Sequence, residues 1–219
     1  MKVSVVTPNY NGLRLLKAYF NSLALQEEFI EEIVIVDNGS DAGSVEFIED
    51  IIEEYPINIK LIRNSENLGF APAVNQGIRA SKSEYIYSLN NDVELEKDTV
   101  EMIVRDMDDS IEMGENPFSF SSKMIQFNNR DLIDDAGDEY TILGWTRKAG
   151  DGKPLDKYDE KREIFSSCGG AALYRRSVLD KIGLFDDKFF AYLEDMDLSY
   201  RAQINGYRHF FSPRSIVYH

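Results

Sequence analysis

The sequence predicts an α/β protein with a mostly parallel central sheet and helices on both sides of it. Through about residue 107, short apolar runs alternate with segments in which apolar residues recur at helical spacing. The apolar runs, such as Ile33–Val36, are continuous, which is typical of strands buried on both faces of a parallel sheet. We therefore expect strands and helices in regular alternation.

Four strand–helix pairs account for this first half. The strands are expected at Val3–Val6, Ile33–Val36, Ile57–Ile62 and Tyr85–Leu89, and the helices are marked by Leu13–Leu23, Val45–Tyr55, Ala71–Ile78 and Val100–Met107. Pro8 ends the first strand, and the residues after Val36 are a turn signal. The resulting fold is Rossmann-like, and in such sheets ligands bind at the carboxyl ends of the strands.

The second half, from about residue 116, is less regular and predicts a smaller mixed or antiparallel portion. Strands are expected within Phe118–Phe127 and at Ala171–Tyr174, His209–Phe211 and Ser215–Tyr218, with helices at Arg176–Ile182 and Asp195–Asn205. Residues 128–163 are rich in Asp, Gly and Lys and are expected to form a long mobile loop, a candidate lid. Residues 1–219 are expected to form one domain, with about 1–115 and about 116–219 as its halves. The stop at His219, directly after an apolar run, is typical of a core cut from a longer protein.

Composition narrows the class of protein. With 219 residues and 43% hydrophobic content, the chain can bury one core, and its net charge of −15 argues against a nucleic-acid binder. A site that holds a divalent cation tolerates such an acidic excess locally. The single cysteine, Cys168, excludes an internal disulfide and fits a cytoplasmic location. No secretory signal is evident, and no apolar run approaches the roughly 18 residues of a membrane helix, so we expect at most peripheral contact with the inner face of a membrane.

Polar residues follow the strands of the first half. Asn9 and Tyr10, Asp37, Asn67 and Asp92 all fall at expected carboxyl ends, where a ligand site would form. Asp37 exceeds what the next helix needs for capping, since Ser40 or Asp41 suffices for that. Gly69 lets the backbone approach a ligand just before a helix start, which favours phosphate. Neither a GxGxxG fingerprint nor a P-loop is present.

Two acidic motifs could carry chemistry. Asn90-Asn91-Asp92 offers one carboxylate for Mg²⁺ or Mn²⁺, which prefer oxygen ligands, although the same residues make a good turn. Glu194-Asp195 opens a helix, where acidic residues often act only as caps. Two adjacent acids after an aromatic run exceed that need, and an ionised carboxylate there could serve as a general base.

Small residues and a histidine complete the candidate set. The glycine pair that ends in Gly170, followed by Ala171, enters a strand, which indicates close approach of a ligand or of a neighbouring element. His219 is either an exposed side chain or a metal ligand.

Taken in order, these motifs resemble those of the family-2 glycosyltransferases, inverting enzymes of the GT-A fold, with the rhamnosyltransferase- and galactofuranosyltransferase-like branch nearest. The matching stretches are VSVVTPNYNG, IVIVDNGSD, RNSENLGFAPAVNQGI, YIYSLNNDV, CGGAALYRRSVLDKIGLFDDKFFAYLEDMDLSYRAQINGYRHFFSP and VYH. They cover most of the chain apart from residues 100–163, and the ordered set is far more specific than any one motif.

The resemblance implies a role for each matching residue. Pro8, Asn9 and Tyr10 would lie against the nucleotide base, Asp37 would contact the base or ribose, and Asn67, Gly69 and Asn91 would line the donor pocket. Gly170 and Ala171 would border the donor sugar, and Asp92 and His219 would bind Mn²⁺ or Mg²⁺. Asp195 would be the catalytic base, with Glu194 a close second. The donor would be a UDP-, dTDP- or GDP-sugar, and the acceptor a cell-surface glycan or lipid-linked sugar. Because Asp92 is the one acid left in the family's DXD motif, the metal is expected to need the donor diphosphate.

Two other functions stay open. A sugar-phosphate nucleotidyltransferase would need a glycine-rich, basic loop near the N-terminus, and Thr7–Leu13 has one glycine and no lysine. A catalytically inactive donor-binding or scaffold module of a larger synthase is the alternative without chemistry, and the presence of both Asp92 and Asp195 argues against it.

Overall fold

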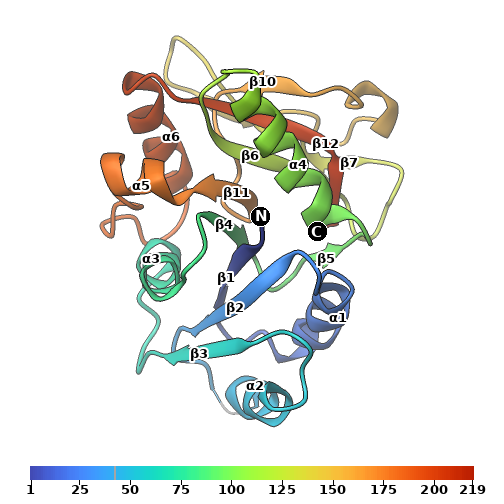
Figure 1. The fold of residues 1–219 in the computed structure, drawn as a ribbon, viewed down its shortest axis with the longest axis vertical. Helices are drawn as coiled ribbons and strands as arrows, with labels where there is room; N and C mark the ends of the chain where they lie inside the picture. The colour runs from blue at the N-terminus through green and yellow to red at the C-terminus, as the bar shows by residue number, and fades with distance from the viewer. Residues whose placement is uncertain (42) are drawn as a thin grey trace.

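A computed structural model of the protein describes residues 1–41 and 43–219, and these form a ten-stranded mixed sheet and a separate two-stranded sheet (Figure 1). The larger sheet has the strand order β10-β12-β6-β11-β4-β1-β2-β3, with β5 on β12 and β7 on β6. The strands are β1 (Val3–Asn9), β2 (Ile30–Asp37), β3 (Ile59–Arg63), β4 (Tyr85–Leu89), β5 (Glu94–Leu95), β6 (Pro117–Ile125), β7 (Ile133–Asp135), β8 (Asp138–Tyr140), β9 (Thr146–Lys148), β10 (Arg162–Ile164), β11 (Ala171–Arg175) and β12 (Arg208–Tyr218).

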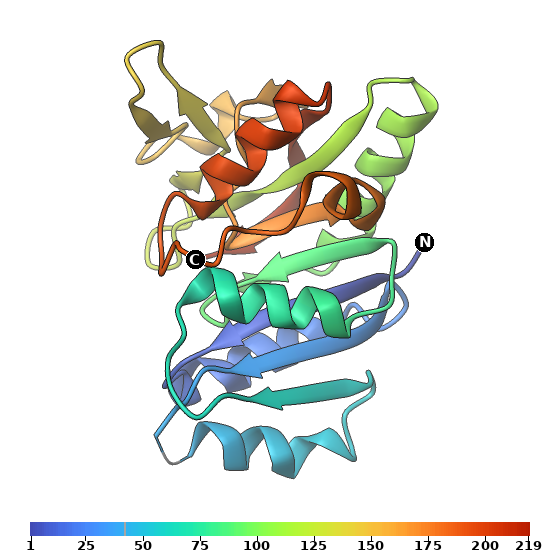
Figure 2. The same cartoon turned by 90° about the vertical axis from the view of Figure 1, so that its left-hand side faces the viewer.

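The helices are α1 (Leu13–Ala24), α2 (Ser44–Ile52), α3 (Phe70–Ala80), α4 (Thr99–Glu112), α5 (Arg176–Ile182) and α6 (Glu194–Ile204), with one short 3₁₀ turn at Leu155–Lys157. They cover both faces of the large sheet (Figures 1 and 2). One core contains apolar side chains of α1, α2 and α4, including Tyr19, Ile48 and Ile103. A second core, which includes Val74 and Leu198, contains those of α3, α5 and α6.

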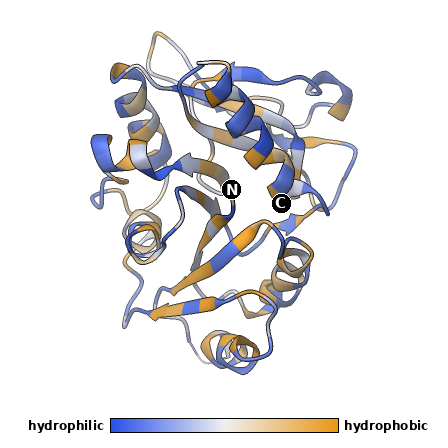
Figure 3. Cartoon of the chain, viewed as in Figure 1, coloured by the Kyte–Doolittle hydropathy of each residue, from blue (hydrophilic) through white to orange (hydrophobic). Residues whose placement is uncertain are grey.

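The expected parallel half is confirmed. β3, β2, β1 and β4 are neighbours and all run parallel. Figure 3 shows β1 and β2 coloured mainly as apolar, whereas the helices carry both colours, as expected for strands covered on two sides by amphipathic helices. Asn9 pairs with Asp37 at the carboxyl ends of β1 and β2, so the polar residues after these strands meet at one edge.

The junction between the halves is antiparallel. β11 lies between β4 and β6 and runs against both, with Ala171 opposite Leu89. β6 and β12 then pair in parallel, and β10 closes the edge antiparallel to β12. The expectation of a smaller mixed portion is therefore confirmed.

The expectation of an unstructured loop at residues 128–163 is wrong. This segment contains β7, which pairs with β6, the β8–β9 hairpin, and β10. Ile133, Ala136, Ile164 and Phe211 form a third small core beneath it. The strands are three residues long, too short to leave a periodic apolar pattern in the sequence.

Two further boundaries differ from expectation. β12 is one strand rather than two, because a register shift between Ser212 and Ile216 absorbs the irregular residues in its middle. The two-residue strand β5 was not expected, since its sequence carries no pattern. Within the described residues, no helix is long and apolar enough to cross a bilayer.

His209 connects α6 to the sheet. Its side chain is fully buried on β12, where Nε2 donates to the Ser199 carbonyl of α6 and Nδ1 accepts from the Ser119 hydroxyl of β6, at 3.1 and 2.7 Å. Burial lowers the pKa of His209 to about 4, so the folded state holds a neutral imidazole.

We predict that His209 makes the protein less stable in acid. Its pKa is lower in the folded than in the unfolded chain, so its contribution is present above pH 6.5 and is lost as pH falls toward 4. The expected loss is about 2 to 3 kcal/mol between neutral pH and about pH 4.5. Urea unfolding at both pH values measures it. Because other groups titrate over the same range, His209→Gln is the control: its loss should be smaller than that of the wild type by this amount, and equal losses would contradict the prediction.

Candidate functional site

Two adjoining cavities lie at the carboxyl ends of β1 and β4. The smaller has a volume of about 270 Å³ and the larger of about 570 Å³. They share four lining residues: Phe70, Asn90, Asp92 and Ala191. Both volumes are near or within the size range of small-molecule sites in proteins.

Most of the residues singled out in the sequence line these cavities. Pro8, Asn9, Tyr10, Asn67, Gly69, Asn91 and Asp92 line the smaller one, and Asp92, Gly170, Glu194, Asp195 and His219 line the larger one. Asp37 and Ala171 line neither. Ala171 is fully buried in the β11–β4 ladder, and Asp37 lies behind Asn9.

A buried polar chain connects Asp37 to the smaller cavity. The Asp37 carboxylate accepts hydrogen bonds from the side chains of Asn9 and Ser40, both at 2.7 Å. The side-chain oxygen Oδ1 of Asn9 in turn accepts one from Asn91 Nδ2 at 2.6 Å. Asp37 is 2% exposed, so it orients Asn9, which orients Asn91 at the mouth of the cavity.

Asn38 holds the opposite wall of the smaller cavity. The sequence pattern marks this residue only as part of a turn. Its Nδ2 donates to the Asn67 side chain at 2.8 Å and to the Gly69 carbonyl at 3.0 Å. Its Oδ1 accepts from Asn64 and from the Leu68 amide. The side chain of Asn38 therefore fixes the whole segment before α3. An Asn side chain can both donate and accept hydrogen bonds, and this is the sequence feature that could have marked Asn38 as part of the site.

Glycine is required where this segment passes the loop before α6. Gly69 has φ +94°, and a Cβ there would clash with the backbone carbonyl of Phe190. The next amide, of Phe70, donates to that same carbonyl at 2.6 Å. The close approach brings residues 190–193 over both cavities.

Asp92 and His219 meet at the junction of the two cavities. His219 Nε2 lies 3.6 Å from Asp92 Oδ2, and its Nδ1 lies 2.9 Å from Asp134 Oδ2. These contacts raise the pKa of His219 to about 9. Partial burial opposes ionisation of Asp92, yet the contact with His219 leaves its pKa below the ordinary value. Asp134 was missed because it lies within residues 128–163.

The backbone fixes the position of His219. Its amide donates to the Ile125 carbonyl at 2.9 Å, and its carbonyl accepts from the Phe127 amide at 2.7 Å. The side chain therefore follows the register of β12 with β6.

Glu194 and Asp195 begin α6 after a strained turn. Tyr192 and Leu193 have φ +73° and +70°, a conformation that non-glycine residues rarely adopt and that is enriched at functional sites. Asp195 accepts from the amides of Gly169 and Met196 at 3.2 and 2.8 Å. Burial raises the pKa of Asp195, although these amides oppose the shift, and burial raises the pKa of Glu194 to about 7.

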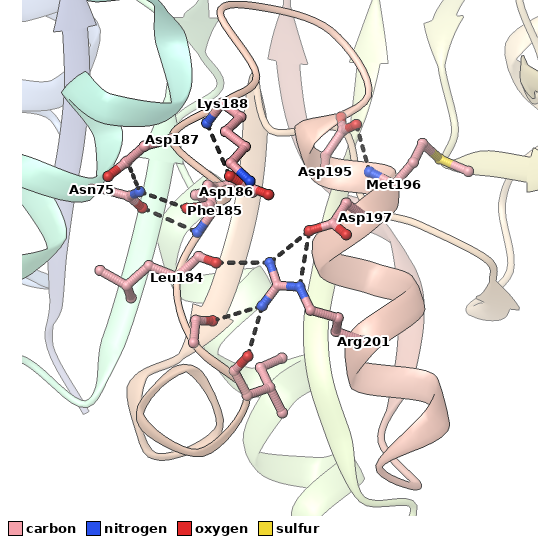
Figure 4. A network of polar contacts seen from close by, with 12 residues as sticks. Asn75, Leu184, Phe185, Asp186, Asp187, Lys188, Asp195, Met196, Asp197 and Arg201 are labelled. Atoms are coloured by element: carbon pink, nitrogen blue, oxygen red, sulfur yellow. Dashed lines mark hydrogen bonds and ion pairs between the residues drawn. The ribbon is translucent and has the colours of Figure 1, made fainter.

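A polar network holds α6 and the preceding loop in place (Figure 4). The Arg201 guanidinium pairs with Asp197 and donates to the carbonyls of Ile182 and Leu184, each at 2.7 Å. Asn75 of α3 exchanges hydrogen bonds with the backbone of Phe185. Asp197 is thus directed toward Arg201 and away from the cavities, whereas Asp195 lines the larger one.

Comparison with known proteins identifies the family of this chain. The family model described as "Glycosyl transferase family 2" matches residues 4–183. The chain belongs to glycosyl transferase family 2. Among its relatives, an uncharacterized glycosyltransferase of Nostoc sp. is 39% identical over 42% of this chain. The N-acetylglucosaminyl-diphospho-decaprenol L-rhamnosyltransferase of Mycobacterium tuberculosis is 24% identical over 98% of it.

Solved structures agree in fold. The crystal structure of GalNAc-T7 with UDP, GalNAc and Mn²⁺ superposes with a TM-score of 0.82 at 19% identity, covering all of this chain. The chain spans 44% of that structure, 28% of the Nostoc relative and 75% of the mycobacterial one. The expectation of a GT-A fold is confirmed.

The family-2 chain offers two donors where a metal is expected. No group of three or more His, Cys, Asp and Glu side chains is arranged to hold a metal within residues 1–41 and 43–219. Asp92 Oδ2 and His219 Nε2 are nevertheless about as close as two adjacent ligands of one ion, which lie ~3 Å apart. The contact of Nδ1 with Asp134 is typical of a metal-binding histidine. These two side chains would therefore fit a divalent ion, with its other ligands to be supplied by the donor diphosphate and water.

We predict that Gly12, at the start of α1 in this family-2 fold, is needed for the contact between Asn9 and Asn91. A Cβ at residue 12 would clash with both side-chain amides, so Gly12→Ala should lower the melting temperature by several degrees, as overpacking costs about 1–3 kcal/mol. Asn91→Ala removes one clashing group. It should destabilise the wild type but recover part of the loss in the Gly12→Ala background, as measured by a double-mutant cycle. Simple additivity of the two changes would contradict this account.

Proposed function

We propose that this chain transfers a sugar from a nucleoside-diphosphate sugar to an acceptor hydroxyl with inversion at the anomeric carbon. The observation that supports this most directly is the pair of adjoining cavities with Asp92 at their junction and Asp195 in the larger one. A nucleotide in the smaller cavity would place its diphosphate near Asp92 and its sugar in the larger cavity. Tyr10 is 52% exposed at the rim of the smaller cavity and is free to stack on a base.

The proposed reaction is a single displacement. Asp195 takes the proton of the acceptor hydroxyl, the oxygen attacks the anomeric carbon, and the bond to the diphosphate oxygen breaks. The nucleoside diphosphate leaves with the bonding electrons, and the configuration of the anomeric carbon inverts. A divalent ion bound by Asp92 and His219 would offset the charge that develops on the leaving diphosphate.

Asp195 is a better base than Glu194 on the present geometry. Two backbone amides orient its carboxylate and stabilise the ionised form, which is the form that accepts a proton. Glu194 lies beside it with one buried carboxylate oxygen that has no partner. We assign Glu194 to a hydroxyl contact with substrate.

For the substrates we propose only the chemical class of the acceptor and of the donor. The mycobacterial relative is named for a lipid-linked diphosphate sugar, and we extend to this chain only the class, a cell-surface glycan or lipid-linked acceptor. A UDP-, dTDP- or GDP-sugar is the donor class. A cytoplasmic location with at most peripheral membrane contact belongs to the same proposal.

Asp195→Asn should abolish turnover while donor binding persists. We expect kcat for transfer, or for slow hydrolysis of the donor, to fall at least about 100-fold, because the base is lost and the side-chain shape is kept. The assay is release of nucleoside diphosphate from UDP-, dTDP- and GDP-sugars with Mn²⁺. Asp180→Asn, an exposed carboxylate on α5, is the control and should retain activity. Normal turnover by Asp195→Asn would refute the assignment, and no turnover by the wild type with any donor would favour an inactive binding module.

Asp134→Asn should weaken metal binding through His219. Loss of the carboxylate at Nδ1 removes the group that orients the imidazole, and such changes typically cost 10–100-fold in metal affinity. Electron paramagnetic resonance of Mn²⁺ with a nucleoside diphosphate present measures the dissociation constant. Asp131→Asn, an exposed change on the same segment, should have no effect. Unchanged Mn²⁺ affinity in Asp134→Asn and His219→Ala alike would exclude His219 as a ligand.

A further inference from the structure

The larger cavity contains carboxylate oxygens without partners. Within the described part of the chain, Asp135 Oδ2 and Glu194 Oε2 are buried and accept no hydrogen bond. Both residues line the larger cavity and are at most 5% exposed. A buried acceptor of this kind is stabilised when a ligand supplies a hydrogen-bond donor.

The wall that carries Asp135 is built by the β7–β8 segment. Asp135 pairs with Met124 of β6, and the Gly137 amide donates to Asp135 Oδ1 at 2.6 Å, which leaves Oδ2 free. Asp138 begins β8 and is fixed through the backbone of Ser166. Asp135 and Asp138 are the acidic contribution of this segment to the cavity wall, and neither belongs to the motifs that mark the family.

Four carboxylates therefore line one cavity: Asp135, Asp138, Glu194 and Asp195. The two basic side chains in the same lining, Lys148 and His219, are already directed at Asp134, at 3.3 and 2.9 Å. Neither of these two side chains is free to receive a negatively charged substituent. The carboxylates are also not grouped closely enough to hold a metal ion within the described residues.

We propose that this cavity selects a sugar ring without an acidic group, a neutral or amino sugar, and that Asp135 and Asp138 form the selecting wall. Ring hydroxyls or an ammonium group donate to the free carboxylate oxygens. A uronic acid would place a further carboxylate among four, without a partner for it. An acidic sugar would thus bury an unpaired negative charge and leave the carboxylate oxygens of the cavity without a donor. Both effects discriminate strongly between closely related ligands. The inference rests on the proposed function and specifies its substrate class.

The test compares two donors that differ only at C6 of the sugar, which carries a hydroxymethyl group in one and a carboxylate in the other. Thermal shift with UDP, dTDP and GDP first identifies the nucleotide that binds in the presence of Mn²⁺. Calorimetry at about pH 8.5, above the pKa of about 8 that burial gives Asp138, then compares matched sugars. If UDP binds, the pair is UDP-glucose and UDP-glucuronate. If dTDP binds, it is dTDP-glucose and dTDP-glucuronate, and if GDP binds, it is GDP-mannose and GDP-mannuronate.

We expect the wild type to bind the neutral donor about tenfold or more tightly than the acidic one. The double variant Asp135→Asn/Asp138→Asn should reduce this ratio to below about threefold, because two of the four charges are gone. Asn at 135 retains the acceptor for Gly137, and Asp138→Asn alone serves if the double variant does not fold. Asp156→Asn, an exposed change in the 3₁₀ turn at Leu155–Lys157, should keep the wild-type ratio.

Equal binding of the two donors by the wild type would overturn the inference, as would a ratio that the variants leave unchanged. Either result would leave the proposed function standing, since a nucleotide would still bind. Absence of binding by any nucleotide would instead reject the proposed function and this inference with it.

Discussion

The antiparallel pairing of β11 with β4 is the constraint on which the rest of the site depends. It joins the parallel half to the mixed half, and it continues beyond Leu89, where the Asn90 amide donates to the Gly170 carbonyl at 2.9 Å. The two glycines before β11 let this happen: a Cβ at Gly170 would press on the Asn90 side chain, and one at Gly169 on the Phe70 ring. The end of β4 is thereby held against the start of α6, although more than 100 residues separate them.

Buried amides and carboxylates then fix the edge of the sheet. Asp37, Asn9 and Asn91 form one chain, and Asn38 with Asn67 forms a second, so the backbone segments after β1, β2 and β4 share side-chain partners. Such networks are costly when incomplete and rigid when complete. The smaller cavity is consequently a preformed surface whose walls are connected to one another behind the ligand-facing atoms.

The sequence was most informative where periodicity is long. Helices and buried strands through α4 follow from apolar spacing, and the strand ends led to Asn9, Asn67 and Asp92, which do line the cavities. Asp37 lies behind Asn9 and lines neither cavity, because strand register alone does not say which polar side chain is outermost. Asp134, Asp135 and Asp138 were not foreseen. They lie on or at three-residue strands that pair with the neighbouring strands β6 and β9, and strands this short leave no periodic apolar pattern from which to predict them.

In β12 the number of residues in an irregular stretch determines where the end of the strand points. Its bulge places three residues, Pro213–Ser215, between the pairs Ser212–Ser122 and Ile216–Lys123. Side chains alternate between the faces of a strand, so the bulge sets the phase of everything after it. Shortening it by one residue, with no other change in register, would move His219 to the place of Tyr218 and turn its side chain to the opposite face, away from Asp92. The number of residues in the bulge is therefore fixed by a contact that lies just beyond the end of the strand.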